Sequence, residues 1–361
     1  MKHLVNLFNT TRKWSLALGL SAVSGLSLSP GLVGFMALGS IGLSSQVMAQ
    51  DEALVIYSSR KEPLIKPFLD AFSKETGIKI TLYTGKDGAL IERIKSEGAS
   101  TPADILMMAD AGNLGYAASQ GLFSPMQSPI LEKNIPAHLR DPQNLWTGLS
   151  IRARTLVYST ERVKPSELST YEELADPKWQ GRLCLRSANT VYNKSLIASQ
   201  IAHNGEAKTE QMVNGWVKNL AAKPFAKDAE VMSAILANRC DVGIVNTYYF
   251  GQEMAKQPEA KIALFWANQD STGTHINVSG AGVIKHSDQK ANAQKLIEWL
   301  SRDPAQTLYS EANFEYPANP NFAVSPQIAA WGEFKADTLN LGKVAQLQEN
   351  AVRLMQKAGL Q

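Results

Sequence analysis

Short apolar runs alternate with helix-like segments from residue 54 to residue 121. Residues 54–57, 78–83 and 103–108 have strand-type composition, and each run is followed by apolar residues at three- and four-residue spacing. Such alternation is typical of β-α units whose strands lie parallel in one sheet. The sequence therefore predicts an α/β fold with a mainly parallel sheet flanked by helices.

A second α/β series follows along the chain. Residues 149–158 form a long strand-like run, and later apolar runs at 183–185 and 241–245 alternate with helical patterns. The glycine-rich segment 275–284 suits a strand that crosses back between two lobes. We therefore expect two α/β lobes joined by extended crossovers, with a cleft that can hinge closed on a ligand.

These patterns also predict the limits of the lobes. The first lobe is expected at 50–152 and again at 276–328, after the crossover, and the second lobe at 153–275. Residues 329–361 are predicted to be a C-terminal helical segment that packs on the second lobe. They include a stretch, from 341 to 358, with an amphipathic helical pattern.

Residues 1–49 have the features of a secretory signal peptide. They contain basic residues but no acidic one, then a long Leu/Gly/Ala/Ser-rich stretch, and they end in Val-Met-Ala, a small-x-small cleavage pattern. A membrane anchor is the alternative, although Gly, Ser and Pro30 interrupt the apolar run. We expect cleavage near Ala49 and a soluble, periplasmic protein.

Net charge gives no support for two classes of partner. The whole chain has 36 basic and 33 acidic residues. Lys2, Arg12 and Lys13 lie in the leader, so the mature chain keeps 33 of each sign and is formally neutral. Charge therefore gives no reason to expect a nucleic-acid or membrane-surface partner, and no later stretch is apolar enough to span a membrane.

Cys184 and Cys240 are the only cysteines in the chain. Neither lies in the leader, so the leader has no cysteine for lipid attachment. Two cysteines in an exported chain predict one disulfide, with two buried thiols as the alternative. Both lie at predicted strands of the second lobe, and parallel neighbouring strands would bring them close together.

Two adjacent tyrosines, Tyr248 and Tyr249, follow the predicted strand 241–245 and precede a helical pattern. In open α/β sheets, ligands bind at the edge where strands end and helices begin. Taken alone, the pair also fits one packed phenol and one exposed amphipathic ring.

Four segments resemble parts of bacterial ferric-iron-binding periplasmic proteins, the substrate-binding components of iron ABC importers. They are 55–62 (VIYSSRKE), 101–104 (TPAD), 176–181 (DPKWQG) and 246–249 (NTYY). The resemblance runs through nearly the whole mature chain and extends to bacterial transferrins and cyanobacterial iron-uptake proteins. It implies a two-lobed periplasmic-binding-protein fold of the type II kind that holds Fe(III) with tyrosine oxygens and a synergistic anion.

Carried over by position, the resemblance assigns the metal ligands to Tyr192, Tyr248 and Tyr249. It assigns anion-binding arginines to Arg60 and Arg152.

The chain also departs from some relatives of this family. These have a histidine, or a histidine followed by a tyrosine, where this chain has Arg60-Lys61, and others have a glutamate where Ala109-Asp110 stands. The first lobe therefore offers no obvious strong ligand. This resembles the subset that uses three tyrosines plus carbonate or a similar anion.

The chemistry of these residues suits Fe(III). Fe(III) is a hard ion that prefers oxygen anions, and three phenolates balance its charge. A dianion then needs two positive partners, for which Arg60 and Arg152 are candidates because arginine presents a planar fork to oxygens. Ser187 and Asn189 lie in a polar run before a predicted helix, where N–H groups can bind the same anion.

Other polar residues are weaker candidates. Asp110 is expected to cap a helix, whereas Tyr57 and Tyr83 end strands on the presumed cleft side. The histidines of the mature chain lack metal-site spacing. We keep Asp110, Tyr57 and Tyr83 as the next candidates if the tyrosine site is incomplete.

The resemblance implies a monomeric periplasmic protein that captures Fe(III) and delivers it to an ABC permease and its ATPase. The sequence contains no nucleophile elbow, P-loop, zinc signature or dinucleotide fingerprint, which argues against an enzyme. Two other hypotheses stay open: a binding protein for an organic solute such as a phosphonate, polyamine or sugar, and an exported enzyme. Tyrosinate bound to Fe(III) is coloured, so a visible band would separate the first hypothesis from the others.

Overall fold

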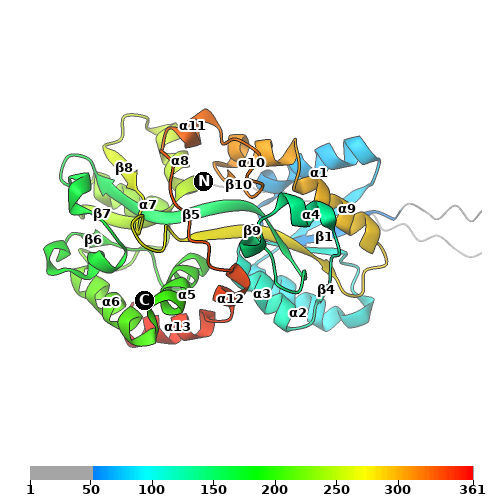
Figure 1. Cartoon of the computed structure of the whole chain (residues 1–361), viewed down its shortest axis with the longest axis horizontal. Helices are drawn as coiled ribbons and strands as arrows, with labels where there is room; N and C mark the ends of the chain where they lie inside the picture. The colour runs from blue at the N-terminus through cyan, green and yellow to red at the C-terminus, as the bar shows by residue number, and fades with distance from the viewer. Residues whose placement is uncertain (1–51, 361) are drawn as a thin grey trace, which may run out of the picture. The chain divides into compact units, whose positions relative to one another are not determined.

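Two long strands, β5 (Thr147–Ser159) and β9 (Ile276–Ile284), run through the middle of the fold (Figure 1). In this computed structural model, which describes residues 52–360, the strands follow the order β2-β1-β3-β9-β5-β7-β6, with β4 paired to β9, and β8 and β10 paired to β5. The other strands are β1 (Leu54–Ser58), β2 (Ile80–Thr84), β3 (Ile105–Met108), β4 (Phe123–Ser124), β6 (Leu183–Cys184), β7 (Val242–Asn246), β8 (Ile262–Phe265) and β10 (Tyr316–Pro317).

Helices flank the strands on both faces. α1, α9 and α10 pack in one apolar cluster with β1, and α2 and α3 pack in another cluster with the same strand. The helices are α1 (Glu62–Thr76), α2 (Asp87–Glu97), α3 (Ala111–Ser119), α4 (Pro129–Asn134), α5 (Val191–Asn204), α6 (Glu206–Asn219), α7 (Asp228–Leu236), α8 (Thr247–Lys256), α9 (Lys290–Leu300), α10 (Ala305–Asn313), α11 (Pro326–Ala329), α12 (Leu341–Ala345) and α13 (Gln348–Lys357).

The α/β class is confirmed, and the sheet is mixed. β1 pairs in parallel with β2 and β3, and β6 pairs in parallel with β7. β9 is antiparallel to β3 and β5, and β5 is antiparallel to β7. Pairing is therefore parallel where β-α units follow one another directly, and antiparallel where the crossover strands return.

β5 changes its partner along its length. Arg152 is paired with Asn277 of β9, whereas Arg154 is paired with Asn246 of β7. Within two residues, β5 therefore passes from the group of strands that continues through β9 to β3, β1 and β2 to the group formed by β7 and β6. The side chains at this switch consequently lie where the two groups meet.

The cores follow from the alternation of side chains along each strand. In β1, Leu54 and Ile56 are buried with α1 and α9, whereas the next residue, Tyr57, is buried on the opposite face with α2. β7 alternates in the same way between two further clusters. Both faces of each group of strands are thus covered, which explains why the strands read as nearly continuous apolar runs.

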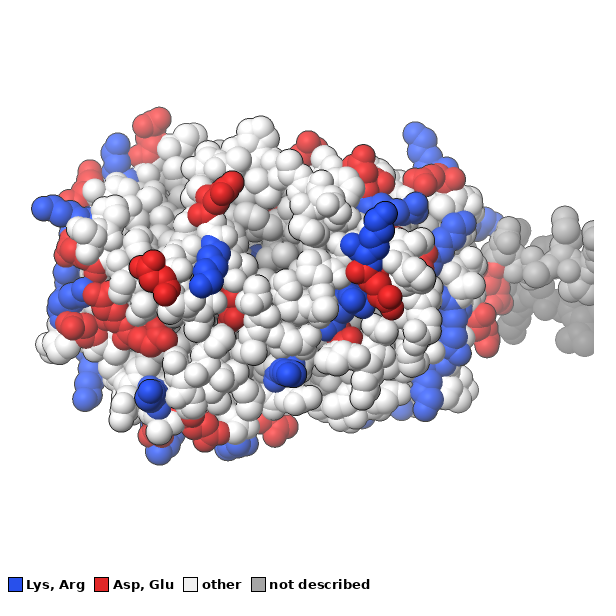
Figure 2. All heavy atoms as spheres, viewed as in Figure 1, with Lys and Arg blue, Asp and Glu red and all other residues white. Residues whose placement is uncertain are grey.

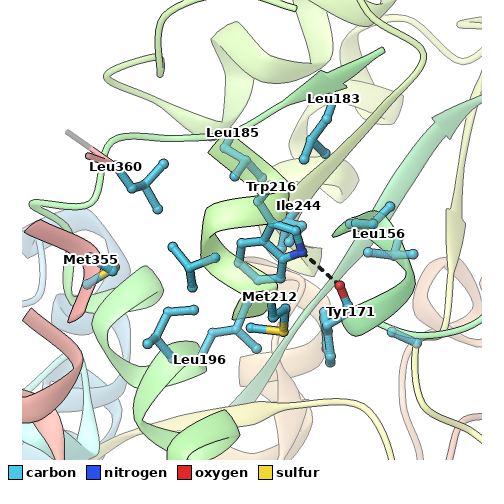
Figure 3. Packing of buried hydrophobic residues seen from close by; sticks show 14 of the residues in the cluster. Leu156, Tyr171, Leu183, Leu185, Leu196, Met212, Trp216, Ile244, Met355 and Leu360 are labelled. Atoms are coloured by element: carbon cyan, nitrogen blue, oxygen red, sulfur yellow. Dashed lines mark hydrogen bonds between the residues drawn. The ribbon is translucent and has the colours of Figure 1, made fainter. Parts of the chain in front are cut away.

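The C-terminal segment completes one of these cores. Figure 3 shows Met355 and Leu360 in the same cluster as Leu196 and Trp216. Within this cluster Trp216 Nε1 donates a hydrogen bond to the carbonyl oxygen of Tyr171 at 2.8 Å, so the indole is both buried and paired.

The amphipathic stretch 341–358 forms two helices, α12 and α13, where the sequence predicts one. α12 packs against α3 and α5, whereas α13 packs against α5 and α6. The chain turns at Gln346 and Leu347, because the two halves bury their apolar sides against different neighbours.

The predicted disulfide joins Cys184 to Cys240, which are 56 residues apart in the chain. Cys184 is the last residue of β6, and Cys240 precedes β7, its parallel neighbour. The bridge therefore ties together the two strands that lead toward α5 and α8.

The predicted signal peptide, residues 1–49, lies outside the described residues. Within residues 52–360, none of the helices combines the length and the apolar character needed to cross a bilayer.

Removing the disulfide should cost stability without changing the fold. The unfolded chain gains the freedom of a 56-residue loop when the bridge is lost, and bridges of this kind typically contribute about 2–4 kcal/mol. We expect the double variant Cys184→Ala/Cys240→Ala to lose stability in this range in urea unfolding followed by circular dichroism. An unchanged midpoint, or thiols that react in denatured but unreduced protein, would contradict the bridge.

Candidate functional site

Three tyrosines meet at the starts of two helices. Tyr192 lies in the first turn of α5, and Tyr248 and Tyr249 lie in the first turn of α8. The Tyr248 hydroxyl donates to the Tyr192 hydroxyl at 2.9 Å, and the rings of Tyr248 and Tyr249 are 4.3 Å apart between centroids. The arrangement thus brings Tyr192 together with an adjacent pair of tyrosines that lies 56 residues away in the chain.

The surroundings of two of these phenols disfavour their ionised form. Burial, with the neighbouring Tyr192 and Tyr249, raises the pKa of Tyr248 well above its ordinary value. Burial also raises the pKa of Tyr192, and the Tyr249 phenol adds to this, although Arg152 opposes both. A cation bound among these oxygens would remove that obstacle, because a metal ion displaces phenolic protons.

Arg154 holds the tyrosine-bearing segments together. Its guanidinium donates to Asn193 Oδ1 at 2.7 Å, to Asn246 Oδ1 at 3.2 Å and to Asp228 Oδ2 at 3.2 Å. Asn193 adjoins Tyr192, and Asn246 is the N-cap of the helix that carries Tyr248 and Tyr249. One buried arginine therefore fixes the relative positions of both helix starts.

Arg152 lies beside the phenols and is poorly paired. Its guanidinium carbon is 5.6 Å from the centroid of the Tyr192 ring. The side chain is only 3% exposed, yet its Nη2 has no hydrogen-bond partner among residues 52–360. Its Nη1 makes one long bond, 3.4 Å, to Ser279 Oγ. Such a buried donor is available to an anion.

Arg60 lies next to Arg152, because both guanidinium groups donate to the Ser279 hydroxyl. Unlike Arg152, it forms a two-pronged ion pair with Glu315, at 3.1 and 2.9 Å. Its Nε remains buried without a partner in the described part of the chain. Arg60 can therefore offer one hydrogen bond, but its charge is already balanced.

Ser187 and Asn189 lie just before α5, as expected, but their amides are engaged. The Ser187 N–H donates to the Phe225 carbonyl at 2.7 Å, and the Asn189 N–H points to Ser187 Oγ at 3.4 Å. Any contact of these residues with an anion would therefore come from their side chains.

The weaker candidates have structural partners. Asp110 is the N-cap of α3 and accepts from the Asn113 N–H at 3.0 Å. Burial, with Asp87, holds the pKa of Asp110 above its ordinary value despite the nearby Arg152. Tyr57 is buried and its hydroxyl donates to Glu97 at 3.0 Å, while Tyr83 is 44% exposed.

Sequence reasoning does not identify four charged residues around the tyrosines: Arg154, Arg186, Asp228 and Glu315. The guanidinium carbon of Arg186 is 5.0 Å from the centroid of the Tyr192 ring and 5.9 Å from that of Tyr249. Arg154 had a usable signal, since it lies two residues after Arg152 and so on the same side of a strand. Arg186 directly precedes the polar run that contains Ser187 and Asn189, which is a second usable signal, whereas Asp228 and Glu315 lie in segments without any motif.

The described residues hold no group of three or more His, Cys, Asp or Glu side chains suited to a metal ion. On the face shown in Figure 2, positive and negative side chains are interspersed, without a large area of one sign.

Comparison with known proteins places the chain among its relatives. Residues 57–307 match the family described as bacterial extracellular solute-binding protein. Iron uptake protein A1 of Synechocystis sp. is 40% identical over 339 residues, which cover 91% of this chain and 94% of that protein.

Solved structures are similar over most of the chain. The structure of a Trichodesmium protein in complex with iron and citrate ligands has a TM-score of 0.82 and 40% sequence identity. The match covers 86% of this chain and 100% of that chain. Ferric iron-binding protein A of Mannheimia haemolytica, in an open conformation, has a TM-score of 0.80 and 38% identity, covering 85% and 98%. These relatives are solute-binding proteins and not enzymes. The chain therefore belongs to the bacterial extracellular solute-binding proteins, in the group of periplasmic iron-uptake and ferric-iron-binding proteins.

Proposed function

We propose that this protein captures Fe(III) in the periplasm, through the phenolates of Tyr192, Tyr248 and Tyr249 and a synergistic anion, and delivers it as a monomer to an ABC permease and its ATPase. The observation that carries this proposal is the convergence of the three phenols, two of them 2.9 Å apart between oxygens, beside a buried arginine with a free donor. The similarity to iron-uptake proteins supports the same metal.

The first step is charge balance at the metal. Three phenolates carry three negative charges, which match those of Fe(III), and hard oxygen anions are the ligands that this ion prefers. The phenols lie in the first turns of α5 and α8, where the N-terminal end of each helix favours negative charge. The helices therefore assist ionisation that burial alone opposes.

The second step is the anion, for which carbonate or a similar oxyanion is the candidate. Arg152 offers its unpaired Nη2 and a positive charge, and Arg60 offers its unpaired Nε. The side chains of Ser187 and Asn189 are further candidates. A carboxylate such as citrate is a second choice, since the similar Trichodesmium structure contains iron together with citrate.

The third step is closure. We assign residues 50–152 and 276–328 to one lobe, and 153–275 with 329–361 to the other. This division is supported by the position at which β5 changes partner, between Arg152 and Arg154, and by the start of β9 at Ile276. The tyrosines belong to the second lobe and Arg60 to the first, so an anion that contacts Arg60 would help to close the first lobe over the iron.

The alternative is a binding protein for an organic solute, in which the same rings stack on the ligand. A visible spectrum and metal analysis of purified protein decide between them. Iron with a tyrosinate band supports our proposal, and colourless protein that fails to take up Fe(III) with bicarbonate would refute it.

Replacing Tyr192 with Phe should remove one ligand and weaken the visible band. The loss of iron affinity should exceed the roughly 10–100-fold that is typical when a group outside the ligand shell is lost. The measurement is competition with a chelator, followed at the band. Tyr158→Phe is the matched control and should keep native affinity. Tyr158 is a buried tyrosine of β5, and it packs in an apolar cluster that does not include the three candidate ligands.

Iron retention should fall as pH falls. The pKa values of Tyr192 and Tyr248 are raised above their ordinary values, so each phenol must lose a proton when iron binds, and protons compete with the metal. By linkage, the slope of log iron affinity against pH counts the protons released on binding. This slope should be smaller in Tyr192→Phe than in native protein, by about one proton per iron bound. Equal slopes would show that Tyr192 does not ionise on binding.

Arg152→Ala should weaken iron retention by leaving the anion less compensated. Buried contacts with charged groups are typically worth about 1.5–3 kcal/mol, or roughly 10–100-fold in affinity. Retention against a chelator should be compared with and without bicarbonate. Arg239→Ala, an exposed arginine of the same lobe, is the control. If native protein and Arg152→Ala retain iron equally in both conditions, the anion has no part in binding.

A further inference from the structure

The charges around the proposed site do not balance with Arg60 and Arg152 alone. Three phenolates neutralise Fe(III), so a dianion such as carbonate still needs two positive charges. Arg60 is paired one to one with the Glu315 carboxylate at 2.9 Å, so that pair is neutral overall. Arg152 forms no ion pair among residues 52–360, but it supplies a single charge. One positive charge is missing.

A second, unbalanced positive charge also lies beside the tyrosine cluster. Arg154 and Arg186 share a single carboxylate, Asp228, at 3.2 and 3.5 Å, so this group of three has a net charge of about +1. Asp228 is fully buried and also accepts the Asn246 N–H at 3.0 Å. The backbone therefore helps to fix the position of Asp228, in addition to its contacts with the two arginines.

The two arginines of this group differ in what they can still bind. Every nitrogen of the Arg154 guanidinium donates to a protein oxygen. Arg186, in contrast, has its Nε and Nη1 buried with no hydrogen-bond partner in the described part of the chain. Its guanidinium carbon lies 5.0 Å from the Tyr192 ring centroid and 5.9 Å from that of Tyr249. Arg186 is thus the member of the group that keeps unused donors beside the phenols, while its long contact with Asp228 leaves the group with its net positive charge.

We propose that Arg186 is a positioning residue of the iron site, and that it supplies the second positive charge needed by the iron–anion assembly. This inference rests on the proposed function. Asp228 holds the guanidinium beside Tyr192 and Tyr249, where its charge offsets the excess negative charge of three phenolates and a dianion. Arg60 then acts as a hydrogen-bond donor from the opposite lobe.

The test measures the bicarbonate concentration needed for half-maximal iron retention against a fixed chelator, together with the wavelength of the visible band. Four versions of the mature protein are compared: native, Arg186→Gln, Arg186→Lys and Arg182→Gln. Arg182 is the matched control, because it is a second-lobe arginine that pairs with Asp241 at 2.6 Å, away from the tyrosine cluster. Circular dichroism and thermal melting verify folding.

We expect half-maximal iron retention by Arg186→Gln to require at least about tenfold more bicarbonate than native protein requires. Its band should also move to longer wavelength, because loss of a neighbouring cation raises the energy of the electrons that a phenolate donates to iron. Arg186→Lys keeps the charge, and both Arg186→Lys and Arg182→Gln should stay within about twofold of native, the scatter between sites that do not interact.

Two results would overturn the inference: native behaviour in Arg186→Gln, or a folded Arg186→Lys as impaired as Arg186→Gln. If Arg186→Gln does not fold, Arg186→Lys decides alone. A tenfold higher bicarbonate requirement in Arg186→Lys rules out a role for the charge, and a native requirement supports that role. Native protein without any iron band would refute the proposed function itself, whereas a normal native band with an unaffected Arg186→Gln refutes only this inference.

Discussion

The buried ion pair between Arg154 and Asp228 is the interaction on which the site depends. Arg154 lies where β5 passes from β9 to β7, and its remaining donors reach Asn193 and Asn246, the residues next to the tyrosines. A buried pair that loses one member typically costs about 3–5 kcal/mol, because the other charge is left without compensation. The pair therefore locks the two helix starts in one arrangement, and the three phenols converge as a consequence.

Around this fixed centre, the cationic side chains fall into two kinds. Arg154 has every guanidinium nitrogen paired and Arg60 has its charge balanced by Glu315, so both serve mainly to hold segments in place, although Arg60 keeps a free Nε. Arg152 and Arg186 each keep buried nitrogens without a hydrogen-bond partner among residues 52–360, and their guanidinium carbons lie 5.6 and 5.0 Å from the Tyr192 ring centroid. Buried polar groups are nearly always paired in folded proteins. Buried guanidinium nitrogens without partners, on two arginines beside the phenols, are therefore best explained by a ligand that brings negative charge, such as an anion bound with a metal.

The fold could be predicted from local patterns to a large extent. Strands such as β1 and helices such as α1 follow from apolar spacing, and the bridge between Cys184 and Cys240 follows from two cysteines at neighbouring strands. The break between α12 and α13 could not be predicted, because amphipathic spacing runs through it and only the packing partners differ. The antiparallel return of β5 and β9 likewise depends on contacts between distant segments.

The sequence by itself determined which residue types fall at strand ends and helix starts, and its resemblance to ferric-iron-binding proteins singled out Tyr248 and Tyr249, Tyr192, and Arg152. Only the tertiary structure decided which charges are available. Glu315 balances Arg60 across 255 residues of chain, and Asp228 is shared between two arginines. The physical reason is that local periodicity reports the face on which a side chain lies, whereas compensation of a buried charge depends on partners brought close only by the packed fold.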